Sequence, residues 1–173
     1  MSRALLASEC LSGKPCRYHG CPDTRYRRRI DRIATELQED QVVWVCPEIL
    51  GGLPTPRPAG RRRKGRIWAD GIVGGEDLTP IFERGAAGAV ALARKVKPCA
   101  IVLFAKSPSC DPEWGLAGRG LRELGVPVIV LGDLRGRRHL VPAIGGLRHP
   151  FRRQSRPLES AIKHPAPAKR DHA

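Results

Sequence analysis

A run of apolar residues from Ala100 to Ala105, followed at once by Lys-Ser-Pro-Ser-Cys, constrains the fold of this chain more than any other stretch. Its branched and aromatic side chains do not alternate with polar ones, which predicts a β-strand that is buried on both faces. Pro108 stops the strand, because proline has no N–H to donate to a sheet. A thiol and two hydroxyls therefore follow the carboxyl end of a buried strand, where open parallel sheets bind ligands.

Other segments of the chain predict the rest of this sheet. Further apolar strands are expected at Arg3–Ala7, Gln41–Val45 and Val126–Leu131. Amphipathic helices are expected from near Arg25, from Thr79 to Lys97 and from Gly115 to Leu124. This β-α-β-α-β-α-β order predicts an α/β fold in a single domain, with a mostly parallel, Rossmann-like sheet covered by helices on both faces.

Glycine and proline are frequent between Ile49 and Gly65, which predicts a loop there. Residues 67–73 are expected to form a small hairpin or an edge strand around Asp70-Gly71, because Asp-Gly is a common hairpin turn. The α/β domain is expected to span residues 1–132. Residues 133–173 lack apolar periodicity and are expected to be a basic, Pro/Arg-rich, disordered tail.

The formal net charge of +14 points to a polyanionic partner. Only 5% of the residues are aromatic, however, so few side chains could stack on nucleic-acid bases. Basic clusters such as 25–29 and 61–64 are more often solvated surface than a binding groove. A weak contact between the basic tail and RNA or another polyanion is therefore a hypothesis from composition alone.

The chain has six cysteines, and no apolar run in it approaches the length of a membrane span. No apolar leader precedes the first strand, so we expect a cytoplasmic, reducing location without a membrane partner. Cysteines in that compartment are metal ligands or reactive thiols more often than disulfides. We expect the protein to be a monomer or a homodimer.

Cys10, Cys46 and Cys110 each follow a predicted strand. Because the carboxyl ends of parallel strands share one edge of the sheet, these three thiols are expected to converge on one metal centre. Thiolates suit iron–sulfur clusters, zinc or Cu(I), but the spacing matches no compact zinc pattern. Cysteine also packs as a small hydrophobic residue, so spacing alone leaves a metal site and ordinary packing as alternatives.

A site with three thiolates keeps one coordination position open, which is typical of a working metal site rather than a structural one. Glu48 and Ser107 would lie at the rim of that position. A carboxylate there can transfer a proton, and a hydroxyl can hydrogen-bond a substrate or water. The alternative is that Glu48 caps a loop and Ser107 caps the turn before Pro108.

Three segments of the chain resemble motifs of the bacterial thiouracil desulfidase family. Ser8 to Gly20 resembles the opening motif, Cys46 to Pro58 the second and Lys106 to Cys110 the third. The likeness runs in the same order from about Leu5 to Leu131. The chain departs from the family motifs at three places. Glu9 stands where the family usually has a small residue, Asp111 replaces a glycine, and the segment Glu113–Gly118 is shortened.

The resemblance implies a [4Fe–4S] cluster that is held by three cysteines and has one open iron. By motif position the ligands are Cys10, Cys46 and Cys110, and Cys16 is the competing ligand or an alternative nucleophile. The implied activity is that of a non-redox desulfidase, a hydrolase or lyase of sulfur metabolism. It removes sulfur as sulfide from a thiolated nucleobase such as 2-thiouracil, or from a related small thio-compound.

The same resemblance assigns roles to four further residues. The iron would act as a Lewis acid while water attacks the thiocarbonyl carbon, with Glu48 as the proton-transfer group. Ser107 would position substrate or water. Arg57 and Lys106 are weaker candidates for contacts with the small thiolated substrate.

Two other hypotheses come from different functional classes. One is a metal-stabilised RNA-binding module that uses the basic surface and acts near thiolated tRNA, and its affinity would fall steeply with salt. The other is a cluster-free thiol protein in which Cys16, beside Arg17, is a nucleophile with a lowered pKa.

Overall fold

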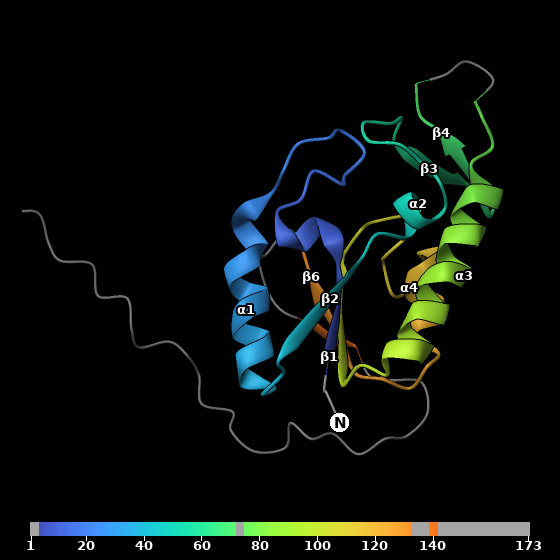
Figure 1. Ribbon diagram of the computed structural model, residues 1–173. Helices are drawn as coiled ribbons and strands as arrows, with labels where there is room; N and C mark the ends of the chain where they lie inside the picture. Colours follow the sequence, from blue (N-terminus) through green and yellow to red (C-terminus); the bar gives the residue numbers. More distant parts are fainter. Residues whose placement is uncertain (1–3, 72–74, 133–138, 142–173) are drawn as a thin grey trace, which may run out of the picture.

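The computed structural model describes residues 4–71, 75–132 and 139–141. Five strands form the main sheet in the order β2-β1-β5-β6-β7 (Figure 1). The first four are parallel: β1 (Ala4–Ser8), β2 (Gln41–Val45), β5 (Ala100–Phe104) and β6 (Val128–Leu131). The predicted α/β fold in a single domain, with its parallel sheet, is therefore confirmed.

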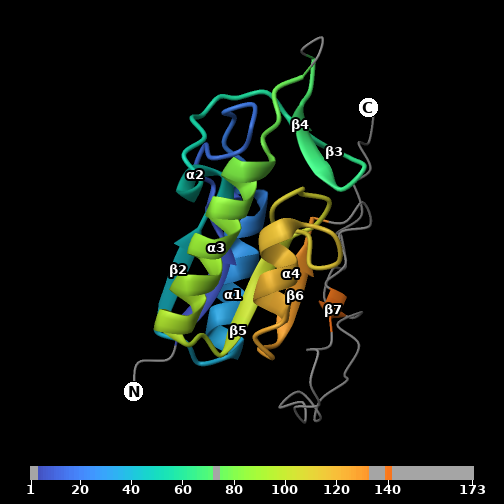
Figure 2. The ribbon, with the colours of Figure 1, turned by 90° about the vertical axis from the view of Figure 1, so that its right-hand side faces the viewer.

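Helices cover both faces of this sheet, as expected. Helix α1 (Arg27–Glu36) lies on one face, and α3 (Thr79–Val96) and α4 (Leu116–Arg122) lie on the other (Figures 1 and 2). Successive strand residues point to opposite faces, so Leu5 packs in the layer of Ile30 on α1 while Leu6 packs in the layer of Ala89 on α3. Burial on both faces explains why the strand sequences are continuously apolar.

The strand order places a topological switch point between β1 and β5. From β1 the chain runs through α1 to β2 on one side, and from β2 it returns through α3 to β5 on the other side of β1. Helix α1 follows β1 and helix α4 follows β5, and these two helices lie on opposite faces of the sheet. The loops that leave the carboxyl ends of β1 and β5 therefore diverge. Open α/β sheets bind ligands in the crevice that this divergence leaves.

A small second layer lies beyond the carboxyl edge of the sheet (Figure 2). It contains α2 (Pro47–Leu50) and a hairpin of β3 (Gly60–Arg63) and β4 (Arg66–Ala69). The prediction of a loop through Gly65 is therefore wrong. The hairpin turns at Lys64-Gly65, both with positive φ, and not at Asp70-Gly71. The short run of arginines in β3 has no alternation that would mark a strand, and its partner β4 is anchored through buried Ile67.

One short strand occurs within the segment that was expected to be a tail. Strand β7 (His139–Val141) pairs antiparallel with β6 at the edge of the sheet. The remainder of the predicted tail, 133–138 and 142–173, lies outside the described residues. Over the described part of the chain, no helix is both long enough and apolar enough to cross a membrane.

Candidate metal and substrate site

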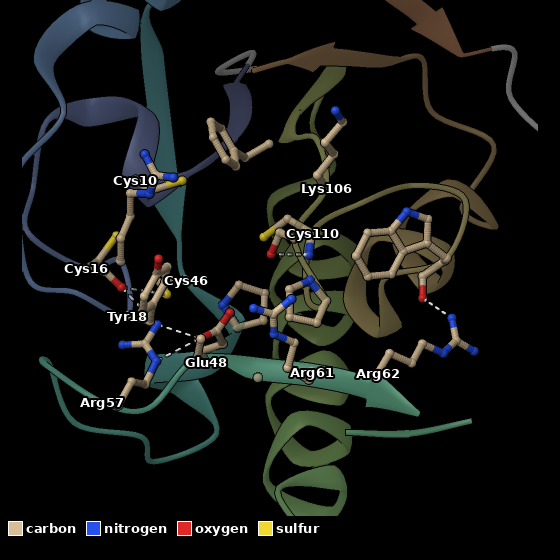
Figure 3. Close-up of a pocket in the computed structure, with 18 residues that line it drawn as sticks. Cys10, Cys16, Tyr18, Cys46, Glu48, Arg57, Arg61, Arg62, Lys106 and Cys110 are labelled. Atoms are coloured by element: carbon tan, nitrogen blue, oxygen red, sulfur yellow. Dashed lines mark hydrogen bonds and ion pairs between the residues drawn. The ribbon is translucent and has the colours of Figure 1, made fainter. Parts of the chain in front are cut away.

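Four cysteines from three strand ends line one cavity of about 560 Å³. Cys10 lies in a 3-10 helix directly after β1, Cys46 follows β2, and Cys110 lies in the turn after β5. Figure 3 shows Cys10, Cys16 and Cys46 on one side of the cavity, with Cys110 facing them. The sequence-based expectation that the three strand-end cysteines meet at one edge of the sheet agrees with this geometry.

Cys16 is buried among the other thiols. Its hydrogen bond with Cys10 raises the pKa of the Cys16 thiol to about 12, and Cys46 contributes a smaller opposing effect. The hydrogen bond with Cys16, together with burial, also raises the pKa of Cys46 far above that of an ordinary thiol. The direction of this shift does not support the hypothesis that Cys16 is a nucleophile with a lowered pKa. Arg17, the cation expected to lower that pKa, turns instead to Asp23, at 3.1 Å.

The turn after β5 holds Cys110 in a buried position. Burial raises the pKa of its thiol to about 12, while a hydrogen bond from Ser8 acts in the opposite direction. The Ser8 hydroxyl also accepts the main-chain N–H of Phe104 at 3.2 Å, which ties the ends of β1 and β5 together. Sequence analysis missed Ser8, although its place at the end of a buried strand was the available signal.

Ser107 caps this turn, which is the structural alternative that the sequence left open. Its Oγ accepts the main-chain N–H of Ser109 at 3.2 Å and that of Cys110 at 3.1 Å. The hydroxyl also contacts the Cys110 thiol and lines the cavity. Because both of its lone pairs accept N–H groups, the Ser107 hydroxyl has only its hydrogen to offer to the cavity.

Glu48 reaches the cavity from α2. Its Oε2 accepts a hydrogen bond from Arg57 Nε at 2.7 Å and lies 2.6 Å from Arg57 Nη2 in the same ion pair, and its Oε1 accepts the Ser109 hydroxyl at 2.9 Å. The Arg57 side chain is 2% exposed, so this ion pair is shielded from water. The sequence placed Glu48 at the rim of the site, but it gave no indication that Ser109 is the hydroxyl that contacts it.

Asp111, one of the three departures from the family pattern, closes the loop beyond Cys110. Its carboxylate accepts the main-chain N–H of Lys106 at 2.8 Å and that of Glu113 at 3.0 Å. Lys106 has a φ of 59°, and this bond stabilises that left-handed conformation. Lys106 and Trp114, which lie at the two ends of this loop, both line the cavity.

The remaining walls of the cavity are aromatic and basic, and sequence analysis did not single them out. Arg61 and Arg62 reach the cavity from β3, and Arg62 donates to the main-chain oxygen of Trp114 (Figure 3). The hairpin therefore forms one side of the cavity. Phe104 lines the opposite part, where the Arg17 guanidinium stacks over its ring at 4.8 Å.

The cysteine thiols that line the cavity fit an iron–sulfur cluster better than a single metal ion. Within the described residues, no three His, Cys, Asp or Glu side chains are close enough to bind one metal ion. A cubane cluster binds each thiolate through a different iron, so its ligands lie farther apart than those of one tetrahedral zinc. Soft thiols facing one another across an open cavity match that requirement.

Comparisons with known proteins agree with this geometry. The family model described as 2-thiouracil desulfurase matches residues 5–116. The protein named "Uncharacterized protein YbbK", from Bacillus subtilis (strain 168), is 34% identical over 114 residues, covering 61% of this chain and 72% of the relative. The solved structure of the [4Fe-4S]-dependent thiouracil desulfidase TudS is 27% identical with a TM-score of 0.53, covering 82% of this chain and 80% of that one. The chain therefore belongs to the 2-thiouracil desulfurase family.

Proposed function

We propose that this protein is a [4Fe–4S]-dependent desulfidase that hydrolyses a thiolated nucleobase such as 2-thiouracil, or a related small thio-compound. The observation that carries the proposal is the meeting of strand-end thiols and the Glu48 carboxylate in one cavity. Support comes from the family and from the likeness to a structure described as a [4Fe-4S]-dependent thiouracil desulfidase.

Cys10, Cys46 and Cys110 would hold the cluster, because they come from separate strand ends and Cys110 faces the other two across the cavity. Cys16 stays the competing ligand, since it lies between Cys10 and Cys46. When bound, the cluster supplies an open, Lewis-acidic iron for the thiocarbonyl sulfur. The raised pKa values of Cys16 and Cys110 mean that both thiols are protonated at neutral pH in the cluster-free protein.

The reaction replaces the C=S double bond of the substrate with C=O, and the sulfur leaves as sulfide without oxidation or reduction. Glu48 takes a proton from the attacking water, because its carboxylate lines the cavity and its Oε1 accepts one hydrogen bond, which leaves a lone pair for the proton. The Ser107 hydroxyl donates its hydrogen to water or substrate. Lys106 contributes a positive charge at the cavity wall.

The aromatic lining of the cavity suits a planar heterocycle. Tyr18, Phe104 and Trp114 line it from different segments of the chain, so an aromatic base can pack against a ring while its thiocarbonyl points toward the cysteines. Arg61 and Arg62 add hydrogen-bond donors for exocyclic oxygens.

The test is anaerobic purification followed by iron and acid-labile sulfide analysis and an assay of sulfide release from 2-thiouracil. We expect about four irons and four sulfides per chain, together with uracil that carries oxygen from labelled water. Cluster-free protein is the control and should release no sulfide. A colourless zinc protein that binds RNA with a steep salt dependence would replace this proposal with the RNA-binding alternative.

A further inference from the structure

Arg57 uses its whole guanidinium on protein groups. A guanidinium has five N–H bonds. The Arg57 Nε–H donates to Glu48 Oε2 at 2.7 Å, and Nη2 lies 2.6 Å from the same oxygen in the ion pair. Three further hydrogen bonds, each at 3.0 Å, run from Nη1 and Nη2 to the main-chain oxygens of Pro54 and Cys16 and the hydroxyl of Thr55. All three guanidinium nitrogens therefore contact protein groups, so Arg57 is engaged in holding Glu48 and the surrounding loops.

The two oxygens of Glu48 are therefore not equivalent. Oε2 accepts the Arg57 Nε–H and lies 2.6 Å from Nη2, so the guanidinium covers that oxygen. Oε1 accepts one hydrogen bond, from the Ser109 hydroxyl at 2.9 Å, so one of its lone pairs stays open. An oxygen with a free lone pair is the one that can accept a proton from water.

We propose that Arg57 and Ser109 are positioning residues that fix the Glu48 carboxylate, so that Oε1 is the proton-accepting atom of the desulfidase reaction. The inference rests on the proposed function. Ser109 acts on Oε1, Arg57 acts on Oε2, and neither contacts the substrate. Both side chains belong to buried residues, so water does not compete for these bonds.

The contacts of Arg57 and Ser109 with Glu48 also connect this residue to two of the segments that carry cysteines. Ser109 lies next to Cys110, and its main-chain N–H is held by Ser107. Arg57 Nη2 binds the main-chain oxygen of Cys16, which also accepts the Cys46 thiol at 3.9 Å. The position of Oε1 relative to the thiols is thus set by the same bonds that shape the two loops.

The test is the Ser109→Ala variant of the cluster-loaded protein. We expect kcat to fall by about 10- to 100-fold, because misplacing a catalytic group by about 1 Å has an effect of that size. KM should stay within about twofold and the iron content should not change, since Ser109 touches neither substrate nor iron. Thr35→Val, which removes a hydroxyl on the exposed side of α1, is the matched control and should leave kcat unchanged.

A second readout does not depend on turnover. The infrared difference between the protein and its Glu48→Gln variant isolates the Glu48 carboxylate band, and loss of the Ser109 hydrogen bond should shift that band in Ser109→Ala but not in Thr35→Val. Arg57→Lys should shift it as well, since a lysine ammonium cannot place two nitrogens against Oε2 as the guanidinium does. Adding Ser109→Ala to Glu48→Gln should lower kcat no further.

The outcomes separate this inference from the proposed function. If the unsubstituted protein releases no sulfide, the proposed function fails, and the infrared band still reports whether Ser109 holds Glu48. If the protein releases sulfide and Ser109→Ala has the parent kcat and an unshifted band, the positioning role is overturned. A fall in kcat that matches a loss of iron would also contradict it.

Discussion

A Cβ atom on Gly85 would lie 1.9 Å from the main-chain oxygen of Pro47. Helix α3 therefore touches the first turn of α2 at a point where only glycine fits. This contact matters for the site, because α2 begins directly after Cys46 and carries Glu48. The long helix behind the sheet thus determines how closely Glu48 approaches the cysteines.

Gly85→Ala should lower the free energy of unfolding by about 1–3 kcal/mol or more, because the new methyl group overlaps a main-chain oxygen. The displaced α2 should also reduce activity. Gly88→Ala on the same helix is the matched control, since its Cβ would meet only Leu50, at 3.7 Å. That change should be neutral or stabilising by about 0.5–1 kcal/mol, because alanine favours helix. Urea unfolding of the two variants measures these changes in stability. Equal stabilities would contradict the close packing of α3 on α2 at Gly85.

Replacing Cys10, Cys46 or Cys110 with alanine should each remove the cluster, because three ligands leave none to spare. Cys16→Ala should retain about four irons and four sulfides per chain. Iron and sulfide analysis after anaerobic reconstitution measures this, with the exposed Cys21→Ala as the control. Iron lost in Cys16→Ala and kept in Cys10→Ala would exchange the roles of these two residues.

Asp111→Ala should destabilise the loop beyond Cys110 by about 1–3 kcal/mol, because main-chain N–H groups of Lys106 and Glu113 lose their acceptor. Since Lys106 and Trp114 line the cavity, we expect KM to rise more than kcat falls. Steady-state kinetics and urea unfolding test this, and Glu113→Ala, an exposed side chain on the same loop, is the control. A change confined to kcat would argue against a role in substrate binding.

Asp23 gives a pH-dependent contribution to stability. Its hydrogen bond with Arg25 lowers the pKa of the Asp23 carboxyl from 3.8 to about 2. A lowered folded-state pKa stabilises the fold above the unfolded pKa, so this contribution is complete at pH 7 and is lost as pH falls from about 4 to about 2. Asp23→Asn should cost about 1 kcal/mol at pH 7, a value reduced by solvent screening of the exposed Arg25.

Urea unfolding of the parent and of Asp23→Asn at pH 7 and pH 3 measures this prediction. The difference between the two proteins should shrink at the lower pH. Asp31→Asn is the control, because its pair with Arg27 joins two half-exposed side chains on the surface of α1 and should matter less. A difference that does not change with pH would show that the Asp23 charge is not responsible.

Local patterns in the sequence were sufficient for the sheet and for the gathering of the cysteines. Continuous apolar runs such as Ala100–Phe104 mark buried parallel strands, and Cys10, Cys46 and Cys110 follow three of them. The sequence placed the hairpin too late in the chain and missed β3, because this strand is short and its arginines are exposed. The alternation of apolar and polar residues in a strand arises because one of its faces is buried. Most residues of this hairpin are exposed, so the alternation is weak.

The sequence by itself determined which residues reach the carboxyl edge of the sheet, because strand ends and breakers are encoded locally. Only the tertiary structure decided which of them touch. Ser109 and Glu48 are 61 residues apart, and nothing in either segment signals that the Ser109 hydroxyl, rather than that of Ser107, reaches the carboxylate. Likewise, the four acceptor atoms of Arg57 come from four residues on helix α2 and two loops. Hydrogen bonds form over about 3 Å, and only the packing of α2, α3 and the loops fixes positions that finely.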